Sequence, residues 1–188
     1  MQTGQVIKTQ NSFYYVQAGS AESLVACKLR GRFKKERCQV VTGDRVEFEA
    51  LTDGTGIIEK RLERQTLLRR PAVANIDQVV LTFAAAQPDL HPLLLNRFLV
   101  LAEWSGIPNI RICVNKIDLL PTAETAKFLS LYEDIGYTVV RVSARENLGL
   151  DALRELLPGH VTVFAGPSGV GKSTLLNAVD TRLQLATG

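Results

Sequence analysis

The spacing of apolar and polar residues changes near residue 70 of the chain. Before that point, short apolar stretches alternate with turns rich in Gly, Asp and Asn, a pattern typical of all-β domains. Strands are predicted at Val6–Lys8, Phe13–Val16, Leu24–Leu29, Val46–Glu49 and Ile57–Ile58. Short strands at this density favour a small β-barrel, for which the OB-fold is the natural candidate. We therefore predict an N-terminal, all-β OB-fold barrel over residues 1–68.

After residue 70, longer apolar strands alternate with segments of helical character. The predicted strands cover residues 78–83, 110–114, 138–142 and 161–165, and the predicted helices cover residues 93–104, 123–135, 150–157 and 172–179. Strands rich in β-branched residues that alternate with helices indicate a parallel sheet covered on both faces. The sequence thus predicts an α/β domain over residues 69–188, with Arg69–Pro71 interpreted as a linker.

Composition excludes several classes of protein. The 188 residues are 46% hydrophobic and 22% charged, close to a globular average, so a disordered, collagen-like or coiled-coil chain is not expected. No apolar run is long enough to span a bilayer, and the first residues do not resemble a secretory signal. The three cysteines, Cys27, Cys38 and Cys113, form no CxxC pair and favour a reducing compartment over a disulfide framework or a zinc site.

The net charge of +3 is unevenly distributed along the chain. Residues 1–71 carry a net charge of +5 and residues 72–188 a net charge of −2, which suggests two units, the first facing an anionic partner. Cations near aromatic residues are typical of nucleic-acid grooves, although a basic surface over buried rings has the same composition. The nearby aromatic residues are Phe13, Tyr14, Tyr15 and Phe33. The candidate RNA-binding residues are Lys28, Arg30, Arg32, Lys34, Lys35, Arg37, Lys60, Arg61 and Arg64.

A phosphate-binding motif, G-x-x-x-x-G-K-[ST], lies between the last predicted strand and the last predicted helix. Successive backbone N–H groups of such a loop converge on phosphate oxygens, and the helix N-terminus adds partial positive charge. We expect Lys172 to reach the β- and γ-phosphates and stabilise the transition state, and Ser173 to bind Mg²⁺. The nucleotide-binding candidates here are Gly166, Pro167, Ser168, Gly169, Val170, Gly171, Lys172, Ser173 and Thr174.

A second motif, Asn115-Lys116-Ile117-Asp118, follows a predicted strand and therefore lies at the carboxyl edge of the predicted sheet. Asp118 can accept hydrogen bonds from guanine N1–H and N2–H₂ together, a donor pair that adenine lacks, so the motif predicts selectivity for guanine. Asn115 can donate to the base or connect loops. The aliphatic stem of Lys116 can lie along the plane of the base.

The order of the motifs along the chain is unusual. Ser143-Ala144-Arg145 follows the next predicted strand, where a backbone N–H near Ala144 could meet guanine O6, and the phosphate-binding loop comes last. That loop comes first in an ordinary GTPase, whereas a circularly permuted GTPase has the order found here. A basic β-barrel ahead of a permuted GTPase domain resembles the ribosome small-subunit-dependent GTPase A family. Residues 42–46, 69–71, 74–79 and 166–177 are similar to the same family.

The resemblance runs along essentially the whole chain, and it implies a function. It implies a cytoplasmic, monomeric enzyme without membrane association that binds GTP or GDP with Mg²⁺ and hydrolyses GTP. It also implies a role late in maturation of the small (30S) ribosomal subunit, with the barrel in contact with 16S ribosomal RNA and with hydrolysis stimulated by the subunit.

The chain also departs from the family pattern. The two switch segments that should follow the phosphate-binding loop, and the family's C-terminal zinc-binding domain, are absent before Gly188. The sequence Asp53-Gly54-Thr55-Gly56 matches the switch motif D-x-x-G but lies in the predicted barrel, where we interpret it as a hairpin turn. In the third motif, Ser143-Ala144-Arg145, Arg145 replaces the Lys that is usual in the family. Because both side chains have an apolar stem, we expect little effect on nucleotide binding. We therefore expect a truncated member with weak nucleotide binding and little turnover, its further catalytic residues unknown.

Two alternatives stay open. The chain could be a P-loop kinase that phosphorylates a metabolite with ATP, in which case it would show no preference for guanine. It could also be a non-catalytic, RNA-binding fragment in which the incomplete α/β half only stabilises the barrel. Nucleotide preference distinguishes the kinase from the GTPase hypothesis. An effect of nucleotide on RNA affinity distinguishes the GTPase hypothesis from the RNA-binding fragment.

Overall fold

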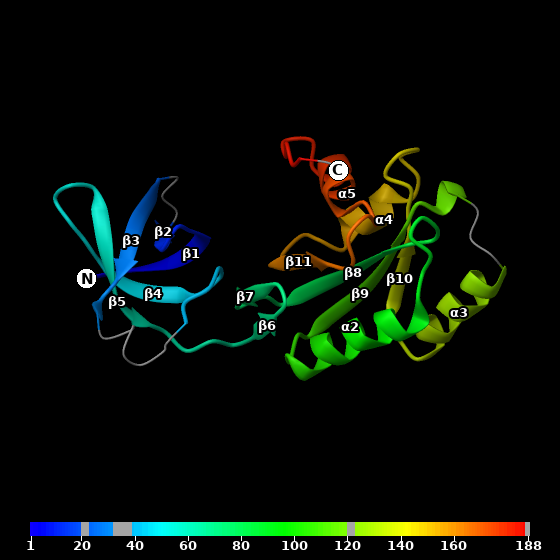
Figure 1. Cartoon of the computed structure of the whole chain (residues 1–188), viewed down its shortest axis with the longest axis horizontal. Helices are drawn as coiled ribbons and strands as arrows, with labels where there is room; N and C mark the ends of the chain where they lie inside the picture. The colour runs from blue at the N-terminus through cyan, green and yellow to red at the C-terminus, as the bar shows by residue number, and fades with distance from the viewer. Residues whose placement is uncertain (20–22, 32–38, 120–122, 187–188) are drawn as a thin grey trace. The chain divides into compact units, whose positions relative to one another are not determined.

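The structure, a computed structural model, describes residues 1–19, 23–31, 39–119 and 123–186. The chain forms two compact units, Met1–Ile76 and Asp77–Gly188. Figure 1 shows a barrel and a short hairpin in the first unit and a sheet with helices in the second. The sequence analysis predicted one all-β domain and one α/β domain, and this fold class is confirmed.

The barrel of the first unit is closed by five strands in the order β1-β2-β3-β5-β4. The strands are β1 (Gln2–Gln10), β2 (Phe13–Ala18), β3 (Leu24–Leu29), β4 (Arg45–Ala50) and β5 (Thr55–Arg61). Strand β1 pairs with both β2 and β4, and β3 runs parallel to β5. Alternate residues point inward, so the core contains Val6, Val16, Cys27, Phe48 and Ile58. The segment at Asp53 is the β4–β5 turn, as interpreted.

The interpretation of Arg69–Pro71 as a linker was wrong. These residues belong to a hairpin of β6 (Leu67–Arg69) and β7 (Ala72–Ala74). The hairpin is held to the rest of the first unit because Ala74 N donates to Thr42 O at 2.9 Å and Asn75 Nδ2 donates to Gly43 O at 2.9 Å. The first unit therefore extends to Ile76, whereas the sequence analysis divided the domains after residue 68. The functions assigned to the two ranges stay predictions.

The second unit is built on a parallel sheet with the order β10-β9-β8-β11. Its strands are β8 (Gln78–Ala84), β9 (Asn109–Asn115), β10 (Thr138–Arg141) and β11 (Thr162–Ala165). Its helices are α2 (Pro92–Trp104), α3 (Ala123–Asp134), α4 (Leu150–Glu155), α5 (Lys172–Val179) and the short 3₁₀ helix η1 (Ile117–Leu119). The four predicted strands and four predicted helices are thus present. Pro92 opens α2, where its missing N–H is tolerated.

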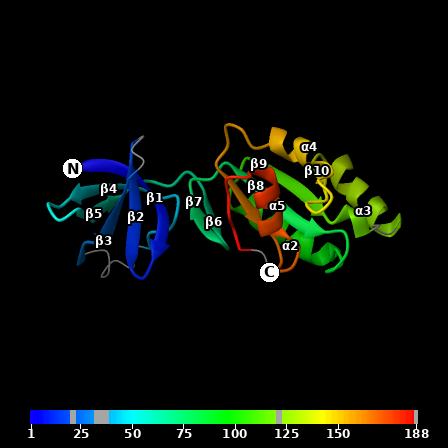
Figure 2. The ribbon, with the colours of Figure 1, turned by 90° about the horizontal axis from the view of Figure 1, so that it is seen from above.

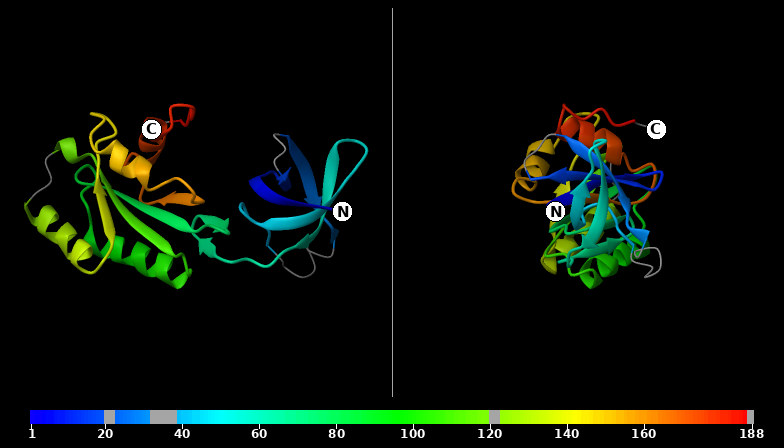
Figure 3. Two further views of the ribbon diagram at one scale, coloured as in Figure 1. Left: turned by 180° about the vertical axis from the view of Figure 1, so that it is seen from behind. Right: turned by 90° about the vertical axis from the view of Figure 1, so that its left-hand side faces the viewer.

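Helices cover both faces of this sheet. Helices α2 and α3 lie on one face and α4 and α5 on the other (Figures 2 and 3). Every residue of β8 is buried as a consequence, and Val80 packs with Leu153 and Leu175 on the α4–α5 side. The four strands run parallel, so the loops that leave β8, β9, β10 and β11 meet at one edge of the sheet. No described helix is long and apolar enough to cross a membrane.

Candidate nucleotide-binding site

Asn115, the last residue of β9, joins two loops at the carboxyl edge of the sheet. Its Nδ2 donates to Val170 O at 2.9 Å, and its Oδ1 accepts from Ala144 N at 3.1 Å. The side chain is almost fully buried, so both hydrogen bonds form away from water. Of the two roles considered for Asn115, the structure shows the connection between loops. The backbone N–H of Ala144 already donates to Asn115 Oδ1. A hydrogen bond to guanine O6 would therefore have to come from a neighbouring backbone N–H.

Lys116 reaches across the site toward the phosphate-binding loop. Its Nζ donates to Gly169 O at 2.7 Å and also to Gln87 O, in the loop after β8. With the ammonium held at the loop, the aliphatic stem lies along the cavity that Asp118 also lines. This is the position from which the stem could cover one face of a base.

The carboxylate of Asp118, on the short helix η1, is oriented by a neighbouring loop. Its Oδ1 accepts a hydrogen bond from Ser143 Oγ at 2.5 Å, and the same Oγ accepts from Glu146 N at 3.1 Å. Ser143 is fully buried, which holds its hydroxyl in place. Asp118 lines a cavity of about 240 Å³ together with Asn115, Lys116, Ser143, Ala144, Arg145, Gly171 and Thr174, and with Gln87 and Leu119.

The phosphate-binding loop requires glycine at its close approaches to the sheet. A Cβ on Gly166 would lie 2.0 Å from Thr82 O, and a Cβ on Gly171 would lie 2.7 Å from Asn115 Nδ2. Both residues also have positive φ angles, 154° and 86°, which L side chains rarely adopt. The loop can therefore approach β8 and Asn115 this closely only with glycine at these two positions.

Lys172 is the first residue of α5 and folds back over the loop. Its Nζ donates to Gly166 O at 2.9 Å and to Pro167 O at 2.6 Å. Partial burial lowers the pKa of this ammonium below its ordinary value, because desolvation disfavours the charged form. A second cavity, of about 360 Å³, is lined by Lys116, Ser168, Gly169, Gly171, Lys172, Ser173 and Thr174.

The two cavities share Lys116, Gly171 and Thr174, so they adjoin, with the Asp118 carboxylate lining one and the Lys172 ammonium lining the other. Two other predicted residues support the site without lining it. Val170 O accepts the hydrogen bond from Asn115 Nδ2, and Ile117 lies in η1 beside Asp118. Sequence reasoning missed Gln87 and Leu119. The rule that ligands bind beyond the carboxyl ends of parallel strands pointed to Gln87, which follows the end of β8.

Comparison with known proteins shows the family. A family model described as RsgA GTPase matches residues 61–188, and one described as RsgA N-terminal domain matches residues 3–58. The chain belongs to the RsgA GTPase family. The resemblance inferred from the order of the motifs is therefore confirmed.

Relatives in the family match the whole of this chain but extend beyond it. The small ribosomal subunit biogenesis GTPase RsgA of Alkaliphilus metalliredigens is 42% identical over 100% of this chain and 64% of its own length. The protein of that name from Halalkalibacterium halodurans is 43% identical, again over 100% of this chain and 64% of its own. The chain thus spans slightly less than two thirds of these RsgA proteins.

Two solved structures share the RsgA architecture. The crystal structure of YjeQ from Thermotoga maritima superposes with a TM-score of 0.82 at 36% identity and covers 100% of this chain and 68% of its own. The crystal structure of YloQ, described as a circularly permuted GTPase, has a TM-score of 0.72 at 38% identity and covers 97% and 65%. The permuted order inferred from the motifs agrees with this description.

The basic residues chosen in the barrel do not all face solvent. The Arg64 side chain is only 17% exposed, and its Nε and Nη2 donate to the two carboxylate oxygens of the fully buried Asp44 at 2.7 and 2.8 Å. Arg30 is more exposed, although its Nη1 donates to Glu59 Oε2 at 2.7 Å. Lys28 and Lys60 are exposed.

The other residues of the first basic cluster cannot be judged in the same way. Arg32, Lys34, Lys35 and Arg37, and with them Phe33, lie outside the described residues. Arg61 Nη1 donates to Gln39 O at 3.2 Å, so part of its guanidinium stabilises the first unit itself. A role in RNA binding therefore stays a prediction for every member of the set, and Arg64 is the member least available for it.

Proposed function

We propose that this chain binds GTP or GDP, together with Mg²⁺, at the carboxyl edge of its parallel sheet. As part of a GTPase of this family it would hydrolyse GTP to GDP and phosphate. The observation that carries the proposal is the pair of adjoining cavities, one lined by Asp118 and the other by Lys172. The relatives named small ribosomal subunit biogenesis GTPases support a role in late maturation of the 30S subunit.

At the base end, selectivity would come from the carboxylate of Asp118. Guanine presents N1–H and N2–H₂ side by side, so it can donate two hydrogen bonds to one carboxylate. Adenine would leave the acceptor unpaired in a half-buried site, which is costly. The hydrogen bond from Ser143 Oγ supports this role because it holds the carboxylate in one orientation before the base arrives.

At the phosphate end, the nucleotide would replace contacts that the loop now makes with itself. The Lys172 ammonium rests on two backbone carbonyl oxygens, and phosphate oxygens are stronger, charged acceptors for it. Backbone N–H groups at the start of α5 add donors and partial positive charge. The Ser173 hydroxyl lines this end and is a hard oxygen ligand of the kind Mg²⁺ takes. Bound Mg²⁺ would neutralise charge on the phosphate oxygens.

Hydrolysis by this chain alone is expected to be slow. Among the described residues, those that line the phosphate end include no Asp, Glu, Gln or His, so this lining offers none of the side chains that usually orient an attacking water. Phosphoryl transfer depends largely on such positioning and on charge neutralisation. Membership of the family supports the remaining parts of the proposal. These are contact of the barrel with 16S ribosomal RNA, stimulation by the 30S subunit, a cytoplasmic location and a monomeric state.

The Asp118→Asn substitution tests the guanine assignment. The unaltered chain should bind GDP in preference to ADP and XDP, and the variant should lose about a hundredfold in GDP affinity while gaining XDP affinity, because an amide complements the xanthine edge. Affinities are measured by calorimetry, and Asp151→Asn, an exposed carboxylate on α4, is the control. Unchanged GDP binding in the variant would contradict the assignment.

Two further measurements separate the alternatives. Equal affinity for GTP and ATP with transfer of phosphate to a metabolite would favour the kinase. RNA binding that survives Lys172→Ala and ignores nucleotide, combined with no measurable GTP binding, would favour the RNA-binding fragment. Single-turnover hydrolysis with and without 30S subunits tests the expected slow rate, and fast, subunit-stimulated turnover by residues 1–188 would refute it.

A further inference from the structure

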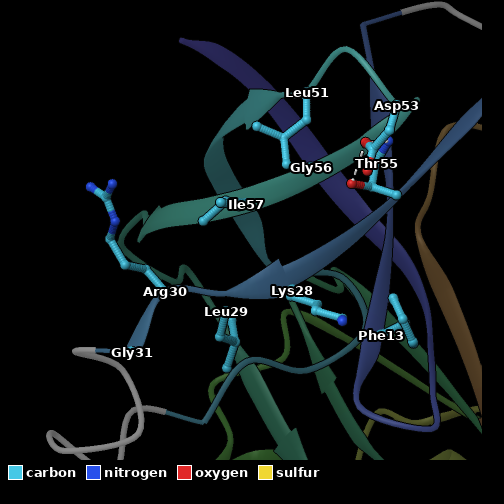
Figure 4. Close-up of a pocket in the computed structure, with 10 residues that line it drawn as sticks. All are labelled: Phe13, Lys28, Leu29, Arg30, Gly31, Leu51, Asp53, Thr55, Gly56 and Ile57. Atoms are coloured by element: carbon cyan, nitrogen blue, oxygen red, sulfur yellow. Dashed lines mark hydrogen bonds between the residues drawn. The ribbon is translucent and has the colours of Figure 1, made fainter.

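The barrel carries a hollow of its own, unrelated to the nucleotide-binding residues. It has a volume of about 560 Å³, within the range of small-molecule sites, and lies against β2, β3, β5 and the turn between β4 and β5 (Figure 4). Most of its side chains lie on the outer surface of the barrel, although Leu29 also packs against the core. Lys28 pairs with Ile57 across β3 and β5, whereas their neighbours Cys27 and Ile58 are buried in the core.

The middle of the hollow combines an aromatic ring with apolar side chains. Phe13 from β2 lines one side, and the Lys28 ammonium lies 5.0 Å from the centre of its ring. Figure 4 shows the Lys28 side chain directed toward Phe13. Leu51 and Ile57 line the opposite wall, and Leu51 is 39% exposed. Phe13 and Ile57 are partly exposed and Leu51 is exposed, and neither Phe13 nor Leu51 belongs to the barrel core, so the ring and these aliphatic groups offer a surface for stacking.

The rim of the hollow carries charges of both signs. Lys28 supplies the positive side, and Arg30 also lines the hollow while its guanidinium pairs with Glu59. On the other side, Asp53 Oδ1 accepts hydrogen bonds from Thr55 N at 2.9 Å and Thr55 Oγ1 at 2.7 Å. These hydrogen bonds lower the pKa of the Asp53 carboxyl, so it stays ionised at neutral pH. An occupant must therefore present an anion at one end and a hydrogen-bond donor at the other.

We propose that this hollow binds one unpaired nucleotide of an RNA strand, with the base against Phe13, a phosphate beside Lys28, and an amino group of the base donating to Asp53. The inference rests on the proposed contact of the barrel with ribosomal RNA and specifies its chemistry. A duplex hides the faces of its bases and presents phosphates along both strands, one of which would meet the Asp53 carboxylate. An unpaired nucleotide matches the ring, the cation and the acceptor together.

The neighbouring residues of β2 allow the strand to continue past the hollow. Tyr15 is two residues from Phe13, so both side chains leave the same face of β2. The Lys8 ammonium lies 5.7 Å from the centre of the Tyr15 ring, which repeats the pairing of Lys28 with Phe13. Two aromatic rings on the same β-strand, each beside an ammonium, offer stacking positions for successive nucleotides of a single-stranded RNA.

The test compares short RNAs on the whole 188-residue chain by fluorescence anisotropy. Labelled single strands of A, C or U and a duplex of equal length are titrated at several salt concentrations. Single strands should bind more tightly than the duplex, and A and C more tightly than U, whose one N–H lies between two carbonyl oxygens that a carboxylate repels. Asp53→Asn should remove the difference between C and U.

Variants of the ring and the cation address the hollow directly. Phe13→Leu should weaken single-strand binding about tenfold, because it keeps apolar bulk but removes the stacking ring, and Phe13→Tyr should restore it. Lys28→Gln should reduce the slope of log affinity against log salt by about 0.7, the value for one phosphate of a single strand. Lys127→Gln, an exposed cation on α3, should leave the slope unchanged.

The outcomes separate this inference from the proposed function. Equal single-strand affinity of Phe13→Leu and the unaltered chain, or tighter binding of the duplex, would refute the nucleotide hollow while leaving the RNA contact of the barrel intact. Failure of the unaltered chain to bind any RNA would overturn both barrel roles. GDP binding at Asp118 is measured in the same variants and should not change, so failure of the nucleotide site is recognised independently.

Discussion

The sequence predicted functional residues both at the edge of the parallel sheet and on the basic surface of the barrel. In the structure the first set converges on one place, whereas the second set does not. At the sheet edge, the residues that the motifs predicted come together: Asn115 connects two loops, and Asp118 and Lys172 line two adjoining cavities. On the barrel, residues chosen by charge separate into exposed Lys28 and the mostly buried Arg64.

The difference follows from what each signal contains. A motif specifies residue types at fixed spacing after a strand, and the carboxyl ends of parallel strands are necessarily neighbours. A count of basic residues contains no information on where each guanidinium points. Arg64 illustrates this, because its charge balances that of Asp44 inside the first unit and is not displayed to a partner.

The sharpest test of this comparison is Arg64→Gln. The substitution leaves the fully buried Asp44 carboxylate without its bidentate partner, and breaking such a pair costs about 3–5 kcal/mol. Hydrogen exchange should show faster exchange in β1–β5, with β8–β11 unaffected. Lys60→Gln, which removes an exposed charge from the same barrel, should change stability by less than about 0.5 kcal/mol. If Arg64→Gln is as stable as Lys60→Gln, Arg64 has no structural role.

The next expected effect is a loss of nucleotide affinity at the sheet edge in Asn115→Ala. The variant loses both hydrogen bonds between the loops and leaves Val170 O and Ala144 N unpaired, at a cost of about 1–3 kcal/mol each if they stay buried. GDP affinity measured by calorimetry should fall at least about tenfold, because the two loops are no longer held together. Asn109→Ala is the matched control, since Asn109 lies at the opposite end of β9 and bonds Asp77 O. Equal GDP affinity in the two variants would contradict a connecting role for Asn115.

The smallest effect concerns one cysteine in each unit. Burial raises the pKa of Cys27, in the barrel core, to about 11 and that of Cys113, in the sheet core, to about 12. Both thiols should therefore resist alkylation at neutral pH. Because folding favours the protonated thiols, stability should decline only as the pH rises from about 9, the unfolded value, toward these pKa values.

Peptide mapping by mass spectrometry follows each cysteine separately. In Arg64→Gln, Cys27 should become reactive before Cys113, since only the first unit loses its buried ion pair. Rapid alkylation of both in the unaltered chain at neutral pH would show that neither core protects its thiol. Simultaneous exposure of both in the variant would show that the two units do not unfold independently.

Local information in the chain was sufficient for the fold class of the two domains, although not for the β6–β7 hairpin. Alternating strands with Asp and Gly turns predicted the barrel, and buried strands followed by helices predicted the parallel sheet, because periodicity and turn residues act within a few neighbours. The phosphate-binding loop and the Asn115–Asp118 motif located the edge of the sheet where the site lies, and their order indicated the family.

The features that the sequence did not reveal depend on contacts between residues that are far apart in the chain. Arg64 meets Asp44 20 residues away, and Asn115 meets Val170 55 residues away. The β6–β7 hairpin became part of the first unit through Thr42 and Gly43, although its sequence suggested a linker. The hollow beside Phe13 likewise exists only because β2, β3 and β5 are neighbours in a closed barrel. Such pairings arise from packing and buried charge, which are properties of the folded chain and not of any short segment of it.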